Sequence, residues 1–172
     1  TLQILRQSKA TAIVVTHDAE EAMRLGDRIA LLKSGRLVQS GRAEELYLNP
    51  VSLFAAGFFS ELNVFDAHVL DGRADTPVGR VDAPGLANGS AVTVAVRMSG
   101  FEASPTAGEI QARVLSRHYL GVVELFDLAI SGVETPVRAR IRCGLIPTGL
   151  RDIWITLRRS DVLVFETERE SA

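Results

Sequence analysis

The stretch that decides the fold of most of this chain is PVRARIRC, at residues 136–143. Apolar and charged side chains alternate in it, so that the apolar ones fall on one face and the three arginines on the other. A period of two indicates a strand with one buried face. Similar runs at 91–97, 152–157 and 161–165 lie between glycine-containing turns. Residues 61–172 are therefore predicted to form a small all-β barrel, closed or nearly closed.

Residues 1–60 have a different pattern. The sequence AIVV at 12–15 is continuously apolar, which is typical of a parallel strand buried on both faces. Helices are predicted at the N-terminus up to about Lys9, at 19–25, 43–48 and 51–59, with a hairpin around Gly35. A single buried parallel strand cannot form a sheet, so we expect this part to be the C-terminal remnant of an α/β domain. The predicted class is α+β, with domains 1–60 and 61–172.

Composition excludes several other classes of protein. The 172 residues are 47% hydrophobic and 23% charged, with a net charge of −2, as in soluble globular proteins without a nucleic-acid-binding basic surface. No apolar run reaches the roughly 18 residues of a membrane-spanning helix, and the first residues lack a secretory signal pattern. The single Cys143 excludes an internal disulfide framework and a multi-cysteine zinc site, which favours a reducing cytoplasm.

Thr16, His17 and Asp18 follow the predicted buried strand, where ligand-binding side chains of open α/β sheets are found. A lone histidine at the end of a strand more often forms a structural hydrogen bond than binds a ligand. However, VVTHDAEEAM at 14–23, followed by DRIA at 27–30, resembles the switch-histidine region of ATP-binding subunits of ABC transporters. The sequences ELYLNP at 45–50 and FAAGF at 54–58 are similar to the segment that closes this domain in importer subunits. The resemblance is close over 1–63 and loose over 64–172.

The resemblance implies that His17 senses and orients the γ-phosphate of ATP. An imidazole suits this role because it can donate a hydrogen bond to a phosphate oxygen and contact the attacking water. Asp18 and Glu21 also match family positions, but acidic residues at a helix start have an ordinary stabilising role, which we favour.

The rest of an ATPase is absent from this sequence. The only lysines, Lys9 and Lys33, do not end a glycine-rich phosphate loop. We therefore expect the chain alone to bind no cofactor or metal and to be inactive, whereas a longer protein would use ATP and magnesium.

The family implies further properties. FFSELN at 58–63, PVGR at 77–80 and the turn at Pro84-Gly85 are most similar to ferric-iron-type importers, although sugar, sulfate, polyamine and phosphonate importers share this layout. The β part would then be an oligonucleotide-binding-like regulatory domain that joins two subunits. Implied partners are a second copy and the membrane-spanning permease, with a cytoplasmic location at the inner face of the plasma membrane. One departure is Arg97-Met98-Ser99, where the family has Arg-Pro-Glu.

Other candidate sites have ordinary interpretations. The arginines of 138–142 could bind an anion or nucleic acid, or simply pair with neighbouring carboxylates. The aromatic residues that could stack on bases, Tyr119, Phe126 and Trp154, are spread over separate segments. His68 and His118 lack partners at metal-ligand spacing. Cys143 is predicted to be a core residue. The alternative to an importer subunit is a free-standing barrel that binds a small ligand or oxyanion; a single-stranded nucleic-acid binder is a third hypothesis.

Overall fold

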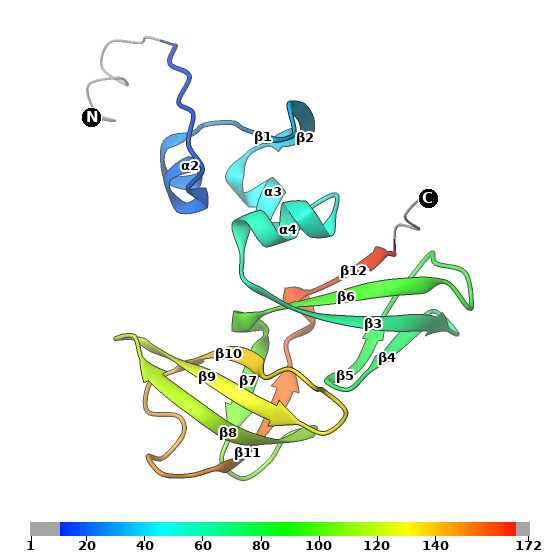
Figure 1. Cartoon of the computed structure of the whole chain (residues 1–172), viewed down its shortest axis with the longest axis vertical. Helices are drawn as coiled ribbons and strands as arrows, with labels where there is room; N and C mark the ends of the chain where they lie inside the picture. The colour runs from blue at the N-terminus through cyan, green and yellow to red at the C-terminus, as the bar shows by residue number, and fades with distance from the viewer. Residues whose placement is uncertain (1–10, 168–172) are drawn as a thin grey trace. The chain divides into compact units, whose positions relative to one another are not determined.

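The computed structural model describes residues 11–167, and the chain divides into two compact units, 1–60 and 61–172. The elements of the first unit are α2 (Ala19–Leu25), β1 (Ile29–Lys33), β2 (Arg36–Gly41), α3 (Ala43–Leu48) and α4 (Leu53–Phe59) (Figure 1). The predicted helices at 19–25, 43–48 and 51–59 and the hairpin are confirmed, the last helix starting two residues later than expected. None of the described helices is long and apolar enough to cross a membrane.

Local signals explain the elements of the first unit. Ser34 and Gly35 both have positive φ, as a two-residue hairpin turn requires, and they join β1 to β2. The Ser52 hydroxyl accepts the Ala55 N–H and caps α4. The Gln39 side chain accepts a hydrogen bond from the Val51 N–H and donates one to the Asn49 carbonyl, which fixes the loop between α3 and α4. The buried core of this unit consists of Ile29, Leu31, Leu46, Ala55 and Phe59.

The predicted buried strand at 12–15 does not form. Residues 11–16 have no regular secondary structure, and Ile13 and Val15 are 92% and 93% exposed. A parallel strand needs hydrogen-bonded neighbours, and none of the residues from 11 to 167 pairs with this segment. Its apolar composition alone therefore gives no strand here. The helix predicted to end near Lys9 lies outside the described residues.

The second unit is built from strands that form two five-stranded antiparallel sheets. One has the order β10-β9-β8-β11-β7 and the other β12-β6-β3-β4-β5. The strands are β3 (Leu62–Leu70), β4 (Arg73–Thr76), β5 (Gly79–Asp82), β6 (Ala91–Arg97), β7 (Phe101–Ser104), β8 (Ile110–Tyr119), β9 (Val123–Ile130), β10 (Val137–Arg142), β11 (Asp152–Leu157) and β12 (Val162–Glu166). Short 3-10 helices at Met98–Gly100 and Arg159–Asp161 precede β7 and β12.

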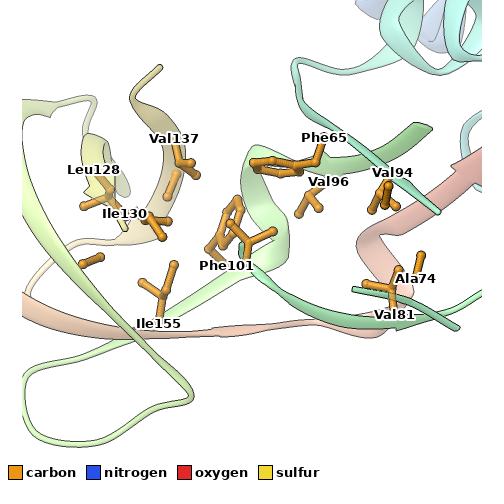
Figure 2. Close-up of a cluster of buried hydrophobic side chains, with 14 of the residues drawn as sticks. Phe65, Ala74, Val81, Val94, Val96, Phe101, Leu128, Ile130, Val137 and Ile155 are labelled. Carbon is orange, nitrogen blue, oxygen red and sulfur yellow. The ribbon is translucent and has the colours of Figure 1, made fainter. Parts of the chain in front are cut away.

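The first of these sheets curls into a nearly closed barrel. Its edge strands β10 and β7 lie next to each other, although no ladder joins them among the described residues (Figure 1). Figure 2 shows Leu128, Ile130, Val137 and Ile155 of the barrel on one side and Phe65, Val94 and Val96 of the other sheet on the opposite side, with Phe101 between them, and all belong to one buried cluster. One continuous apolar core therefore holds both sheets. The predicted class, α+β with a small barrel, is confirmed.

Asn63 on β3 connects the two sheets through hydrogen bonds. Its side-chain oxygen accepts the Arg138 N–H at 2.7 Å, and its amide nitrogen donates to the Arg138 carbonyl at 2.8 Å. The Asn63 side chain thus satisfies both backbone groups of a β10 residue, as a neighbouring strand would. Asn63 itself is 9% exposed, so these bonds form where water has little access.

Candidate functional site

The three residues Thr16, His17 and Asp18 lie directly before α2. Asp18 is the N-cap residue of this helix, and its side chain accepts the Glu21 N–H at 2.9 Å. Glu20 and Glu21 occupy the first turn, where negative charge is favourable to the helix dipole. Asp18 and Glu21 therefore stabilise the start of α2, which is the ordinary role that the sequence favoured.

Thr16 makes two further hydrogen bonds in this segment. Its hydroxyl donates to Glu21 Oε2 at 2.6 Å and accepts the Asp18 N–H at 3.1 Å. These hydrogen bonds hold the backbone on both sides of His17, at Thr16 and at Asp18. His17 itself is exposed and makes no hydrogen bond with any residue from 11 to 167. It borders an open depression with Glu21 and Arg24, so a ligand can reach its ring.

These residues alone do not fit ATP and magnesium. A nucleotide site needs backbone N–H groups and a lysine around the phosphates, with carboxylates for the metal. The only lysines are Lys9 and Lys33, and Lys33 Nζ lies 4.6 Å from the centre of the Phe54 ring. Within the described part of the chain, no group of three His, Cys, Asp or Glu side chains could hold a metal ion. The segment offers one accessible imidazole and no phosphate cradle.

The arginines of β10 are mostly engaged in ion pairs. Arg138 lies 3.4 Å and Arg140 3.2 Å from the Glu61 carboxylate, and Arg138 is also 3.8 Å from Asp127. Arg142 has no ion pair with the residues that the structure describes. Pairing with neighbouring carboxylates is therefore the observed state of two of the three side chains. The structure does not show an open anion-binding stripe.

The three aromatic residues considered for base stacking do not come together. Phe126 is fully buried in the core, Trp154 on β11 is half-buried and Tyr119 at the end of β8 is 74% exposed. A stacking surface needs several exposed aromatic faces along one groove. This arrangement gives no such surface.

His68 and His118 are both exposed, on β3 and β8. His118 Nε2 lies 3.4 Å from the Ser116 hydroxyl, and neither histidine belongs to a cluster of metal-ligating side chains in the described residues.

The prediction that Cys143 is a core residue is wrong. It lies one residue beyond β10, because the strand ends at Arg142 and the chain turns at Gly144, which has a φ of 81°. The side chain is half-buried rather than part of the core, and its thiol donates to the Gly121 carbonyl at 2.9 Å. Desolvation, together with the charge of Glu124, raises the pKa of the Cys143 thiol. The neutral thiol is therefore favoured over the reactive thiolate.

Sequence reasoning missed a charged cluster inside the barrel. Glu124 on β9 is only 6% exposed, and Arg117 on β8 binds it in a bidentate manner, with Nη2–Oε2 at 2.6 Å and Nε–Oε1 at 2.8 Å. The guanidinium lies 5.2 Å from the Phe126 ring centre and also donates to the Pro147 carbonyl. The hydrogen bonds to Glu124 raise the pKa of Arg117. One signal was available: Glu124 occupies the same alternating face as Phe126, Leu128 and Ile130.

Comparison with known proteins finds relatives among import ATP-binding proteins. No family model matches the chain. The Fe(3+) ions import ATP-binding protein FbpC of Serratia marcescens is 31% identical over 149 residues, covering 84% of this chain and 43% of that protein. FbpC 1 of Rhodococcus jostii is 32% identical over 140 residues, covering 80% of this chain and 40% of that protein. The homologues of this chain are ATP-binding subunits of ABC importers. The matched stretch corresponds to the C-terminal region of these subunits.

Subunits named for another substrate also match. The spermidine/putrescine import ATP-binding protein PotA of Vibrio cholerae is 45% identical over 84 residues, covering 49% of this chain and 22% of that protein. The chain spans less than half the length of these ABC importer subunits. Among solved structures, the cytoplasmic molybdate-binding protein ModG matches with a TM-score of 0.48 and 16% identity, covering 63% of this chain and 97% of ModG.

Proposed function

We propose that this chain is the C-terminal part of the ATP-hydrolysing subunit of a bacterial ABC importer for ferric iron. The observation that carries the proposal is the 31–32% identity with two iron-import subunits over 80% and 84% of the chain. In this proposal residues 1–60 end the ATP-binding domain, and residues 61–172 form a regulatory domain that joins two subunits. The subunit acts in the cytoplasm, bound to the membrane-spanning permease.

His17 is the residue of this chain that takes part in hydrolysis. Its ring is exposed and has no partner among the described residues, and hydrogen bonds of Thr16 hold the backbone on either side of it at the start of α2. A ring N–H in this position can donate a hydrogen bond to the γ-phosphate of ATP, which is held by residues of the longer protein. The chain alone lacks that phosphate cradle and is therefore inactive.

A polyamine is the second candidate substrate. PotA 1 of Pseudomonas aeruginosa is 35% identical over 144 residues, although the match covers only 73% of this chain. The iron-import proteins of Serratia marcescens and Rhodococcus jostii match a larger share of the chain, 84% and 80%, which supports ferric iron.

The test compares the longer protein with the 172-residue chain. We expect the longer protein, with its permease, to hydrolyse ATP and to restore uptake of labelled ferric iron in cells from which its gene is deleted. We expect calorimetry of the 172-residue chain to detect no binding of ATP. Restoration of labelled spermidine uptake instead would replace iron by a polyamine. Micromolar ATP binding by the chain alone, or stoichiometric binding of an oxyanion without any ATPase activity in the longer protein, would contradict the proposal.

A second expectation concerns self-association. The exposed apolar side chains of Ile13, Val14 and Val15 form a surface of a kind that is uncommon on a stable monomer. The proposed regulatory domain supplies a second, independent contact. We expect light scattering to report a dimer for the 172-residue chain, and a dimer also for residues 61–172 because that contact lies in the β unit. A monomeric 61–172 chain would assign the association to the first unit instead, and a monomeric 172-residue chain would exclude both contacts.

A further inference from the structure

The Thr16 hydroxyl makes two hydrogen bonds, which connect the residues before and after His17. It donates to the Glu21 carboxylate at 2.6 Å while it accepts the Asp18 N–H at 3.1 Å. A hydroxyl has one hydrogen and two lone pairs, so it can make both bonds at once. The bond to an ionised carboxylate is of the stronger, charge-assisted kind. The residues on either side of His17 are thus joined to the first turn of α2.

This attachment matters because nothing else among the described residues orients the histidine. The preceding residues 11–15 are exposed and have no regular secondary structure. The His17 side chain is exposed and makes no hydrogen bond with residues 11–167. The position from which its ring projects therefore depends on the backbone at Thr16 and Asp18. That backbone is held by the Thr16–Asp18, Thr16–Glu21 and Asp18–Glu21 bonds.

We propose that Thr16 and Glu21 are positioning residues that fix the backbone from which the His17 imidazole projects, before any ligand arrives. The inference rests on the proposed function, in which His17 contacts a γ-phosphate. A backbone that is already ordered loses less conformational entropy when the side chain that it carries meets a ligand. Its geometry also needs no reorganisation during the reaction. Glu21 therefore has a second role beyond stabilising the helix start, because it is the acceptor that holds Thr16.

The test is NMR relaxation of the 172-residue chain. The order parameter of the His17 amide is expected to be near 0.85, as in rigid backbone, and to fall below about 0.6 in Thr16→Val. Valine has a similar shape but lacks the hydroxyl. Thr16→Ser restores the hydroxyl and is expected to restore the order of His17. The matched control is Glu20→Gln, which changes the neighbouring carboxylate of the same turn and is expected to leave His17 unchanged.

A purely helix-stabilising role gives a different result. In that case Thr16→Val would lower the order parameters throughout Ala19–Leu25, whereas positioning predicts a loss confined to residues 16–18. Unchanged resonances of residues 29–59, which hold the core of the first unit, verify that this unit is folded in each variant. An unchanged His17 order parameter in Thr16→Val, or a loss that serine does not restore, would overturn the inference.

Kinetics of the longer protein separate this inference from the proposed function. We expect Thr16→Val to lower kcat about tenfold with little change in KM for ATP, and Thr16→Ser to stay near the unmodified protein. If the longer protein hydrolyses no ATP, the proposed function fails while the NMR result still decides the positioning role. If Thr16→Val keeps full kcat in an active ATPase, the positioning inference fails and the proposed function stands.

Discussion

ATP turnover by the longer protein is expected to fall at least about 100-fold when His17 is replaced by alanine, with ATP affinity largely unchanged. In the proposed function, the affinity comes from the phosphate-binding residues elsewhere in that protein, whereas the imidazole acts on the γ-phosphate during the reaction. Because the His17 side chain is exposed and makes no hydrogen bond with the described residues, its removal leaves the fold unchanged. Steady-state ATPase rates and equilibrium nucleotide binding provide the two measurements.

The chain offers matched controls for this substitution. His68 and His118 are also exposed histidines, but they lie on strands of the β unit. His68→Ala and His118→Ala are expected to retain nearly full turnover. A His17→Ala protein that keeps more than about half of its turnover would contradict the role assigned to His17.

The second large effect is on stability. Arg117→Met removes the only ion-pair partner that the described residues give to the buried Glu124 carboxylate. Glu124 cannot regain water at this position, and an uncompensated buried charge destabilises a protein strongly. We expect the free energy of unfolding to decrease by about 2–4 kcal/mol, measured by urea denaturation. A guanidinium stays charged at any accessible alkaline pH, and the hydrogen bonds to Glu124 raise the pKa of Arg117 further, so the pair is not lost as pH rises.

Arg113 on the same strand provides the control. Its ion pair with Asp152 is exposed, with 67% and 54% of the two side chains accessible. Arg113→Met is expected to change stability by less than about 1 kcal/mol. Replacing both members of the buried pair, as Arg117→Met with Glu124→Leu, is expected to recover part of the loss because no unpaired charge remains. Equal losses for Arg117→Met and Arg113→Met would show that burial of Glu124 has no effect.

The elements that could be predicted from sequence are those with a local cause. The alternation at 136–143 gave β10 with its buried and exposed faces, and the turn residues at Ser34-Gly35 gave the hairpin between β1 and β2. The start of α2 at Asp18 was equally visible, since an N-cap bond involves residues only three positions apart.

The features that were missed depend on distant residues. The run at 12–15 has the composition of a buried strand, but a strand forms only where neighbours pair with it. The division of the β unit into two sheets depends on which strands pair, and alternation within one strand does not reveal its neighbours. The hydrogen bonds between Thr16 and Glu21 and between Arg117 and Glu124 require the folded geometry, because neither pair stands at a recognised motif spacing.

The two bonds of Asn63 make one amide proton a reporter of how the β unit opens. The Arg138 N–H is bonded to a side chain on the opposite sheet and not to a strand of its own sheet at that point. Its exchange with deuterium therefore requires the two sheets to separate, whereas amides within a ladder exchange when their own strands fray. Comparing the exchange rate of Arg138 with those of Leu128 and Phe126 on β9 would distinguish separation of the sheets from unfolding of the barrel. A binding partner that separates the two sheets would thus increase the deuterium-exchange rate of the Arg138 amide.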